Sequence, residues 1–222
     1  GADAGEALAR GLDAPDLAGV VVLCEGLGVN GSELTRGLRA VLGARVPVTG
    51  GLAGDGGRFE RTWVLDGATP RIGWVSALGL YGAAVRIKHG SKGGWDIFGP
   101  ERVATRSQGN VLYELDGKPA LDLYRRYLGE RAAGLPATAL LFPLAVRATR
   151  DDTPVVRTVL SVDEIERSMT FAGDIPQGSL AQLMRANFER LIQGASEAAT
   201  ESSAADEGPS VCIAISCIGR RL

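Results

Sequence analysis

The chain has 222 residues, 45% of them hydrophobic and 23% charged, which is the composition of a globular protein with enough apolar side chains for a core. Its formal net charge of −2 and its aromatic content of 5% give no electrostatic or stacking reason to expect nucleic acid or an acidic membrane surface as a partner. The single histidine excludes a histidine-rich metal site and any two-histidine chemistry built from this chain alone.

The opening of the chain predicts a parallel strand–helix–strand unit. The continuous apolar run at 19–24 suits a strand that is covered on both faces. Asn30 or Ser32 can cap the following helix, which carries an apolar stripe and ends at Gly43. Farther along, short turns between apolar runs favour antiparallel pairing. The elements expected in this half are strand 19–24, helix 33–42, strands 46–49, 61–65, 72–80 and 83–88, a glycine-rich loop at 90–100, strands 101–106 and 111–115, and helix 120–128.

The second half predicts a three-stranded meander followed by a long helix. Behind a capping Ser179, apolar side chains recur at helical spacing from Leu180 to Ile192, and only Asn187 interrupts them. The elements expected here are strands 140–146, 155–162 and 169–172, a helix from 179 to about 199, a polar connection at 202–209 and an apolar strand at 211–217.

These elements predict an α/β protein of layered, largely antiparallel sheets flanked by helices. Its helices have one apolar face each, while several strands are apolar throughout, so an αββα-like order would bury the sheets between layers. The runs at 19–24 and 211–217 each carry a cysteine near the end. That similarity fits two related halves, and it fits chance equally well.

The cysteines favour a reducing compartment. Cys24, Cys212 and Cys217 are odd in number and lack the spacing of a zinc ribbon, so free thiols are expected. A signal peptide and an apolar stretch of membrane-spanning length are both missing, which favours a cytoplasmic location. Because the chain begins at Gly1 and stops just after an apolar run, we expect a fragment of a longer protein.

Two glycine-rich loops are candidate anion sites. Residues 26–31 match the G-x-G-x-x-G pattern between a strand and a helix, but Glu25 lies where a phosphate would bind and no acid ends the next strand. A tight strand-to-helix turn is the favoured interpretation there. Residues 50–57 hold five glycines, which suits either an anion-binding nest or a plain flexible connector.

His89 ends a predicted strand at the mouth of a glycine-rich loop. It can be a surface residue, a hydrogen-bonded structural group or an axial metal ligand, and the first two are the more common. One imidazole cannot hold zinc alone, but it can hold a haem in an apolar pocket, to which Trp95 could contribute.

Other side chains allow further hypotheses. Cys217 or Cys24 could serve an enzyme as a nucleophile, in which case its thiol should alkylate quickly at neutral pH. The arginine pair at 220 and 221 could bind a carboxylate, although such residues are more often merely solvated.

Several stretches together are far more specific than any single motif. They are Gly94–Pro100, Thr105–Tyr124, Phe142–Leu144, Phe171–Gly178, the loop Gly50–Asp55 and the ending Ser216–Arg220. Through them the chain resembles the FIST family, named for F-box and intracellular signal transduction proteins. The resemblance implies the later part of a FIST N-terminal region at 1–120 and a truncated FIST C-terminal region at 121–222.

The resemblance implies a sensory, ligand-binding role rather than an enzyme. FIST proteins accompany two-component and cyclic-dinucleotide signalling proteins in bacteria, and the family is proposed to bind small ligands such as amino acids. We therefore expect a bacterial cytoplasmic module that relays ligand binding to a histidine kinase or a cyclic-dinucleotide signalling protein, with no nucleic acid or membrane as a partner.

A subset of the family binds haem, senses nitric oxide and regulates histidine kinases, and membership there would make His89 the axial ligand. The ligand site is otherwise expected where three loops converge, at 51–57, 89–95 and 217–220. The residues predicted to bind the ligand are Gly51, Asp55, Gly94, Trp95, Asp96, Cys217 and Arg220.

Overall fold

The fold is that of a computed structural model, which describes residues 1–203 and 209–220. The chain forms two compact units. The first unit contains Gly1–Gly54, Arg61–Gly94 and the described residues from Phe188 onward, and the second contains Asp55–Glu60 and Trp95–Asn187. Within the described residues, no helix combines the length and the apolar character needed to cross a bilayer.

The first unit is built on a three-stranded sheet in the order β2-β1-β5. Strand β1 pairs in parallel with β2 and antiparallel with β5, which confirms the predicted strand–helix–strand opening. The Asn30 side chain accepts hydrogen bonds from the N–H groups of Ser32 and Glu33, and so caps α2. The elements of this unit are α1 (Ala2–Leu12), β1 (Leu17–Cys24), α2 (Gly31–Leu42), β2 (Val48–Leu52), β3 (Val64–Asp66), β4 (Thr69–Arg71), β5 (Val75–Tyr81), α4 (Phe188–Ser202) and η3 (Ile218–Arg220).

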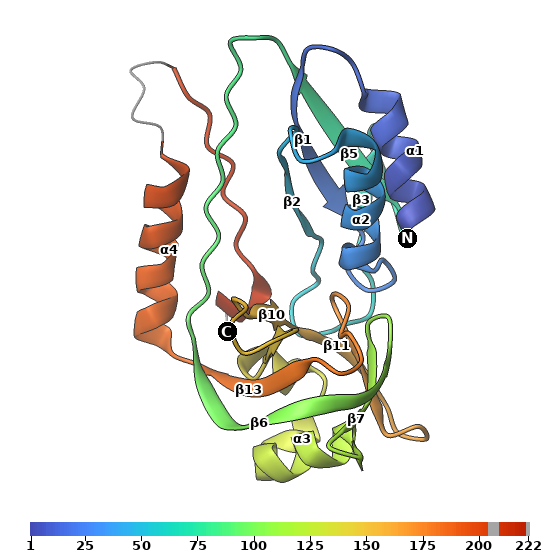
Figure 1. The fold of residues 1–222 in the computed structure, drawn as a ribbon, viewed down its shortest axis with the longest axis vertical. Helices are drawn as coiled ribbons and strands as arrows, with labels where there is room; N and C mark the ends of the chain where they lie inside the picture. The colour runs from blue at the N-terminus through green and yellow to red at the C-terminus, as the bar shows by residue number, and fades with distance from the viewer. Residues whose placement is uncertain (204–208, 221–222) are drawn as a thin grey trace. The chain divides into compact units, whose positions relative to one another are not determined.

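One face of this sheet is covered by α1 and α2, which lie side by side (Figure 1). The buried stripe of α2, formed by Leu34, Leu38 and Leu42, packs on Val20 and Cys24 of β1. The apolar spacing in the sequence therefore predicts the inner face of this unit correctly.

The second unit is an eight-stranded antiparallel sheet in the order β10-β9-β13-β6-β7-β12-β11, with β8 paired to β7. Figure 1 shows β6 curving alongside β13, with α3 packed against the sheet. The buried face of α3, including Leu121 and Tyr124, meets Leu112 and Phe171 in the core. The elements of this unit are β6 (Trp95–Gln108), β7 (Val111–Leu115), β8 (Lys118–Pro119), α3 (Ala120–Leu128), η1 (Gly129–Gly134), η2 (Ala137–Leu141), β9 (Leu144–Arg147), β10 (Val155–Arg157), β11 (Val159–Asp163), β12 (Ser168–Phe171) and β13 (Leu180–Ala186).

The predicted fold class is confirmed: helices flank sheets that are largely antiparallel. The helix predicted at 120–128 has those bounds. The αββα order and the relation between two halves stay predictions.

Four predicted elements are wrong, wholly or in part. Residues 83–88 and 211–217 form no strand, and residues 95–100 belong to β6 instead of a loop. Residues 180–186 form β13 rather than the start of a helix, because β9 and β6 hydrogen-bond to its two edges and bury Ala181 and Leu183. Only α4 continues as the predicted helix.

The predicted meander is wrong in its arrangement. The pairs β9–β10 and β11–β12 do form, but β13, β6 and β7 lie between them in the sheet. The sequence pattern also missed α1, and part of the predicted connection at 202–209 lies outside the described residues.

Candidate functional site

The turn between β1 and α2 is closed by its own carboxylate. The Glu25 oxygens accept hydrogen bonds from the N–H groups of Leu27 at 2.8 Å and Gly28 at 2.7 Å, and also from the Thr62 hydroxyl. Burial alone would raise the pKa of the Glu25 carboxyl, but these hydrogen bonds outweigh it and hold the pKa below its usual value. The amides that a phosphate would need are thus already used, which supports the tight-turn interpretation over a dinucleotide site.

Asp55 plays a similar part in the second unit. The residue is only 8% exposed, and its carboxylate accepts hydrogen bonds from the N–H groups of Phe59 at 3.1 Å and Glu60 at 2.8 Å. A loop whose amides turn toward an internal carboxylate repels an incoming anion. The anion-nest hypothesis therefore gains no support from Asp55.

The first unit holds a polar groove of about 400 Å³ beside α4. Its only ion pair among the described contacts joins Lys92 Nζ to Glu201 Oε1 at 2.5 Å, and the hydrogen bond to Glu201 raises the pKa of Lys92. Gln193 Nε2 donates to Glu197 Oε1 at 2.8 Å one helical turn away. The residues that line the groove are Lys92, Gln193, Ser196, Glu197, Thr200 and Glu201.

Glycines place the segment that carries Lys92 directly against α4. A Cβ on Gly90 would lie 2.0 Å from the Ala198 carbonyl oxygen, and one on Gly94 would lie 2.3 Å from the Leu191 nitrogen. In Figure 1 this green segment runs alongside the orange helix α4. Only residues without a side chain allow that approach at these two positions.

Arg220 fastens the two parts of this groove together. Its guanidinium donates to the carbonyl oxygen of Leu191 on α4 and, at 2.5 Å, to that of Lys92. The position of Lys92 over α4 is thus held by hydrogen bonds as well as by glycine contacts.

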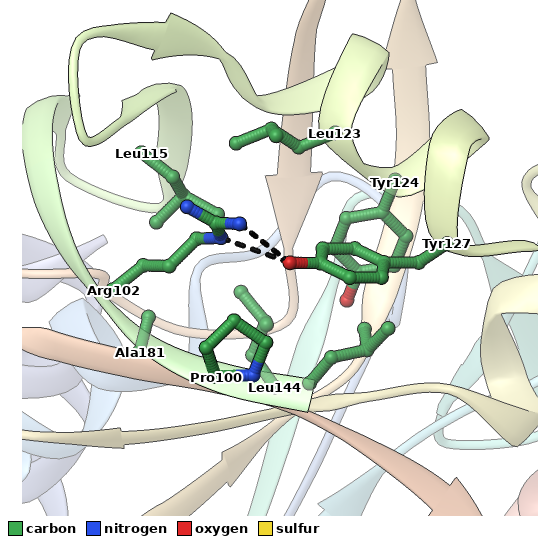
Figure 2. Close-up of a pocket in the computed structure, with 9 residues that line it drawn as sticks. Pro100, Arg102, Leu115, Leu123, Tyr124, Tyr127, Leu144 and Ala181 are labelled. Atoms are coloured by element: carbon green, nitrogen blue, oxygen red, sulfur yellow. Dashed lines mark hydrogen bonds between the residues drawn. The ribbon is translucent and has the colours of Figure 1, made fainter. Parts of the chain in front are cut away.

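A second hollow lies in the second unit, around Arg102 (Figure 2). Arg102 donates to the Tyr127 hydroxyl and, through Nη1, to Asp116 Oδ2 at 2.8 Å. At about 10 Å³ this cavity holds no more than one water molecule as it stands. Its lining residues are Pro100, Arg102, Leu115, Leu123, Tyr124, Tyr127, Leu144, Ala181 and Leu183.

Comparison with protein families decides the identity of the chain. The FIST N domain matches residues 1–118, and the FIST C domain matches residues 120–222. The chain belongs to the FIST family. No curated protein and no solved structure matches it. FIST domains are associated with sensory modules of signal transduction, and that general role holds for this chain.

The predicted ligand-binding residues of this FIST chain are divided between its two units. Gly94 and Arg220 both lie against α4 beside the groove. Gly94 allows the close approach of the Leu191 backbone, and Arg220 donates to the carbonyl oxygens of Leu191 and Lys92. Gly51 lies in the same unit beside Ile215, whose side chain would be 3.2 Å from a Cβ there. Cys217 is also in the first unit and is exposed.

Trp95 and Asp96 belong to the second unit, where they begin β6. Asp96 Oδ2 accepts a hydrogen bond from Asn187 Nδ2 at 2.8 Å, which joins the start of β6 to the residue after β13. Asp55 is also assigned to this unit. The predicted set is thus not assembled within either unit alone.

His89 does not have the surroundings of a haem ligand in this FIST chain. The residue is exposed on an extended segment, and the groove beside that segment is lined by charged and polar side chains. A haem needs an apolar pocket around its iron ligand. The surroundings of His89 therefore do not fit a haem.

The cysteines divide into one buried thiol and two exposed ones. Burial, with a smaller contribution from the neighbouring Glu25 carboxylate, raises the pKa of Cys24 to about 11. A thiol with that pKa is almost entirely protonated at neutral pH and is a poor nucleophile. Cys24 thus lacks the activation that the enzyme hypothesis requires, while Cys212 and Cys217 are free and exposed.

Sequence reasoning missed the residues that actually shape the two hollows. Lys92 lay inside a predicted loop, and α4 was expected to begin nine residues too early. Arg102, Asp116 and Tyr127 lie on or beside three different elements, so no spacing in the sequence links them. Only Gly90 and Gly94 could have indicated the groove from the sequence, because a glycine is typical of a position where another backbone comes close.

Proposed function

We propose that this FIST chain is the ligand-binding part of a sensory protein, and that a small zwitterion such as an amino acid binds in the groove along α4. The observation that carries the proposal is the presence of Lys92, Glu197 and Glu201 in one groove of about 400 Å³. An ammonium group and carboxylates close together match the two charged ends of such a molecule.

The existing contacts explain how a ligand could enter. Lys92 is paired with Glu201, and Glu197 accepts from Gln193, so a zwitterion would exchange these contacts for pairs with its own two ends. Ion pairs at exposed sites contribute at most about 1 kcal/mol each. We therefore expect weak binding, with a Kd on the order of 1 mM.

The test is a two-dimensional NMR titration of the full chain with the common amino acids. The bound ligand should shift the amide signals of Gln193 and Glu197, and Lys92→Ala and Glu197→Gln should each weaken binding at least several-fold. Lys88→Ala is the matched control, because Lys88 is exposed on the same segment but does not line the groove. An amino acid that binds Lys92→Ala as well as the unaltered chain would contradict the proposed location.

The same proposal includes a relay to a signalling partner, such as a histidine kinase or a cyclic-dinucleotide signalling protein. Family membership supports it, and it requires no catalysis by this chain. A ligand that biases one conformation changes the affinity for the partner, and the partner then changes the affinity for the ligand by the same factor. A ligand that leaves the affinity for the partner unchanged in a titration would rule out this coupling.

A further inference from the structure

Arg102 in the second unit is held in one orientation by a chain of contacts. Its Nη1 donates to Asp116 Oδ2 at 2.8 Å, and Asp116 Oδ1 accepts from the N–H group of Val103 at 2.8 Å. Asp116 adopts a positive φ of 50° in the turn between β7 and β8, which aims its carboxylate back at β6. The guanidinium is therefore fixed before any ligand arrives.

The other edge of this guanidinium faces a single neutral oxygen. Nε and Nη2 of Arg102 both donate to the Tyr127 hydroxyl, at 3.2 Å and 2.5 Å. That edge carries two parallel N–H groups, which is the arrangement that binds both oxygens of a carboxylate. The two N–H groups thus share one phenol oxygen, whereas a carboxylate would offer each of them its own charged oxygen. Tyr127 is therefore a weaker partner for this edge than a carboxylate would be.

The rest of the hollow is apolar. Figure 2 shows the Arg102 and Tyr127 side chains meeting between leucine and alanine side chains from β7, α3, β9 and β13. Tyr127 is half-buried and stands one residue before the end of α3, where its ring also meets Phe98 edge-on at 6.5 Å between centroids. A rotation of this one side chain would uncover both the guanidinium edge and the apolar lining formed by Leu115, Leu123, Leu144, Ala181 and Leu183.

We propose that Tyr127 closes a binding site for a small carboxylate with a short aliphatic tail, in which Arg102 binds the carboxylate and the leucines contact the tail. The one edge of Arg102 that Tyr127 covers, on a guanidinium whose charge is partly balanced by Asp116, favours a singly charged carboxylate over phosphate. The apolar lining favours an aliphatic tail over a second polar end. This site is separate from the groove along α4 and does not depend on it.

The test uses 4-methylpentanoate as the probe, titrated into the full chain by calorimetry or ligand-observed NMR. We expect weak binding to the unaltered protein and binding at least tenfold tighter to Tyr127→Ala, because the hydroxyl no longer competes and the cavity is open. Tyr127→Phe removes only the hydroxyl and should tighten binding by a smaller factor, even if Tyr127→Ala fails to fold. Adding Arg102→Gln to either variant should abolish binding.

Two controls separate this site from other causes. Tyr113→Ala should leave binding unchanged, because Tyr113 stacks under Arg106 in a similar pair outside the cavity. The uncharged 4-methylpentanamide should bind at least tenfold more weakly than the carboxylate. The proposal is overturned if neither Tyr127 variant tightens binding, if the amide binds equally well, or if binding survives Arg102→Gln; loss of binding in Lys92→Ala would then locate it in the groove along α4.

Discussion

Glu25 is only 3% exposed, yet its carboxylate keeps its charge because it accepts hydrogen bonds from three donors. Each donor belongs to the turn after β1 or to Thr62, so the charge organises the loop that leads into α2. A carboxylate with such partners stabilises the folded chain when it is ionised.

Glu25→Gln should lower the free energy of unfolding by about 1–3 kcal/mol at pH 7, because the amide cannot accept from both Leu27 and Gly28. The folded-state pKa of Glu25 lies below its unfolded value of about 4.3. The stabilisation is therefore full above that unfolded value and is lost as the pH falls through the folded pKa. Urea denaturation at pH 7 and pH 3.5 should show a smaller difference between variant and unaltered chain at the lower pH.

Glu166→Gln is the control for this experiment, since Glu166 is an exposed residue in a turn and should change stability by less than about 0.5 kcal/mol. A difference for Glu25→Gln that stays constant over the pH range would show that the Glu25 charge does not stabilise the turn.

At the scale of elements, the packing of α1 on α2 depends on two glycines that face each other's helix. A Cβ on Gly5 would lie 2.4 Å from the Leu34 carbonyl oxygen, and one on Gly37 would lie 1.9 Å from that of Ala2. The two helix backbones thus meet without side chains between them. This contact requires glycine inside both helices, although glycine is among the residues that favour a helix least.

Gly37→Ala should destabilise the protein by about 1–3 kcal/mol, because the added methyl group forces the helices apart. Gly11→Ala in α1 has nothing within 4 Å of the new Cβ and should stabilise the protein by about 0.5–1 kcal/mol. Thermal or urea denaturation of the two variants should therefore give shifts of opposite sign. A stabilising shift for Gly37→Ala as well would mean that α1 and α2 are not in close contact at Gly37.

At the scale of the whole molecule, each unit has its own hydrophobic core. The first is centred on Leu38 and its neighbours from α1, α2 and β1, and the second on Leu121, Tyr124 and Phe171. The family regions divide the chain at residues 118–120, whereas α4, which follows β13, returns to the first unit.

Leu38→Ala and Leu121→Ala should each cost about 2–5 kcal/mol of stability, since both side chains are fully buried. Hydrogen exchange followed by mass spectrometry should show faster exchange for Leu38→Ala in β1 and α2 and for Leu121→Ala in β7 and β12. Equal acceleration of all four elements in both variants would show that the two cores unfold as one.

Local chemistry alone determined several elements of this protein. Helix α2 is defined by neighbouring residues alone, namely the Asn30 cap, its leucine stripe and Gly43 at its end. Helix α3 is bounded in the same way by Pro119 and Gly129. The motifs quoted from 50 to 220 were also sufficient to indicate the FIST family, which the family comparison confirmed.

Only the tertiary structure decided the rest, because it depends on contacts between distant residues. Residues 180–186 have helical spacing but become β13, since backbone hydrogen bonds to β6 and β9 outweigh that local preference. Likewise, Lys92 meets Glu201, and Arg102 meets Tyr127, across separations that no periodicity encodes. The sequence by itself therefore established the family and the helices α2 and α3, while the sheet order and both candidate binding sites follow from which distant side chains the fold brings into contact.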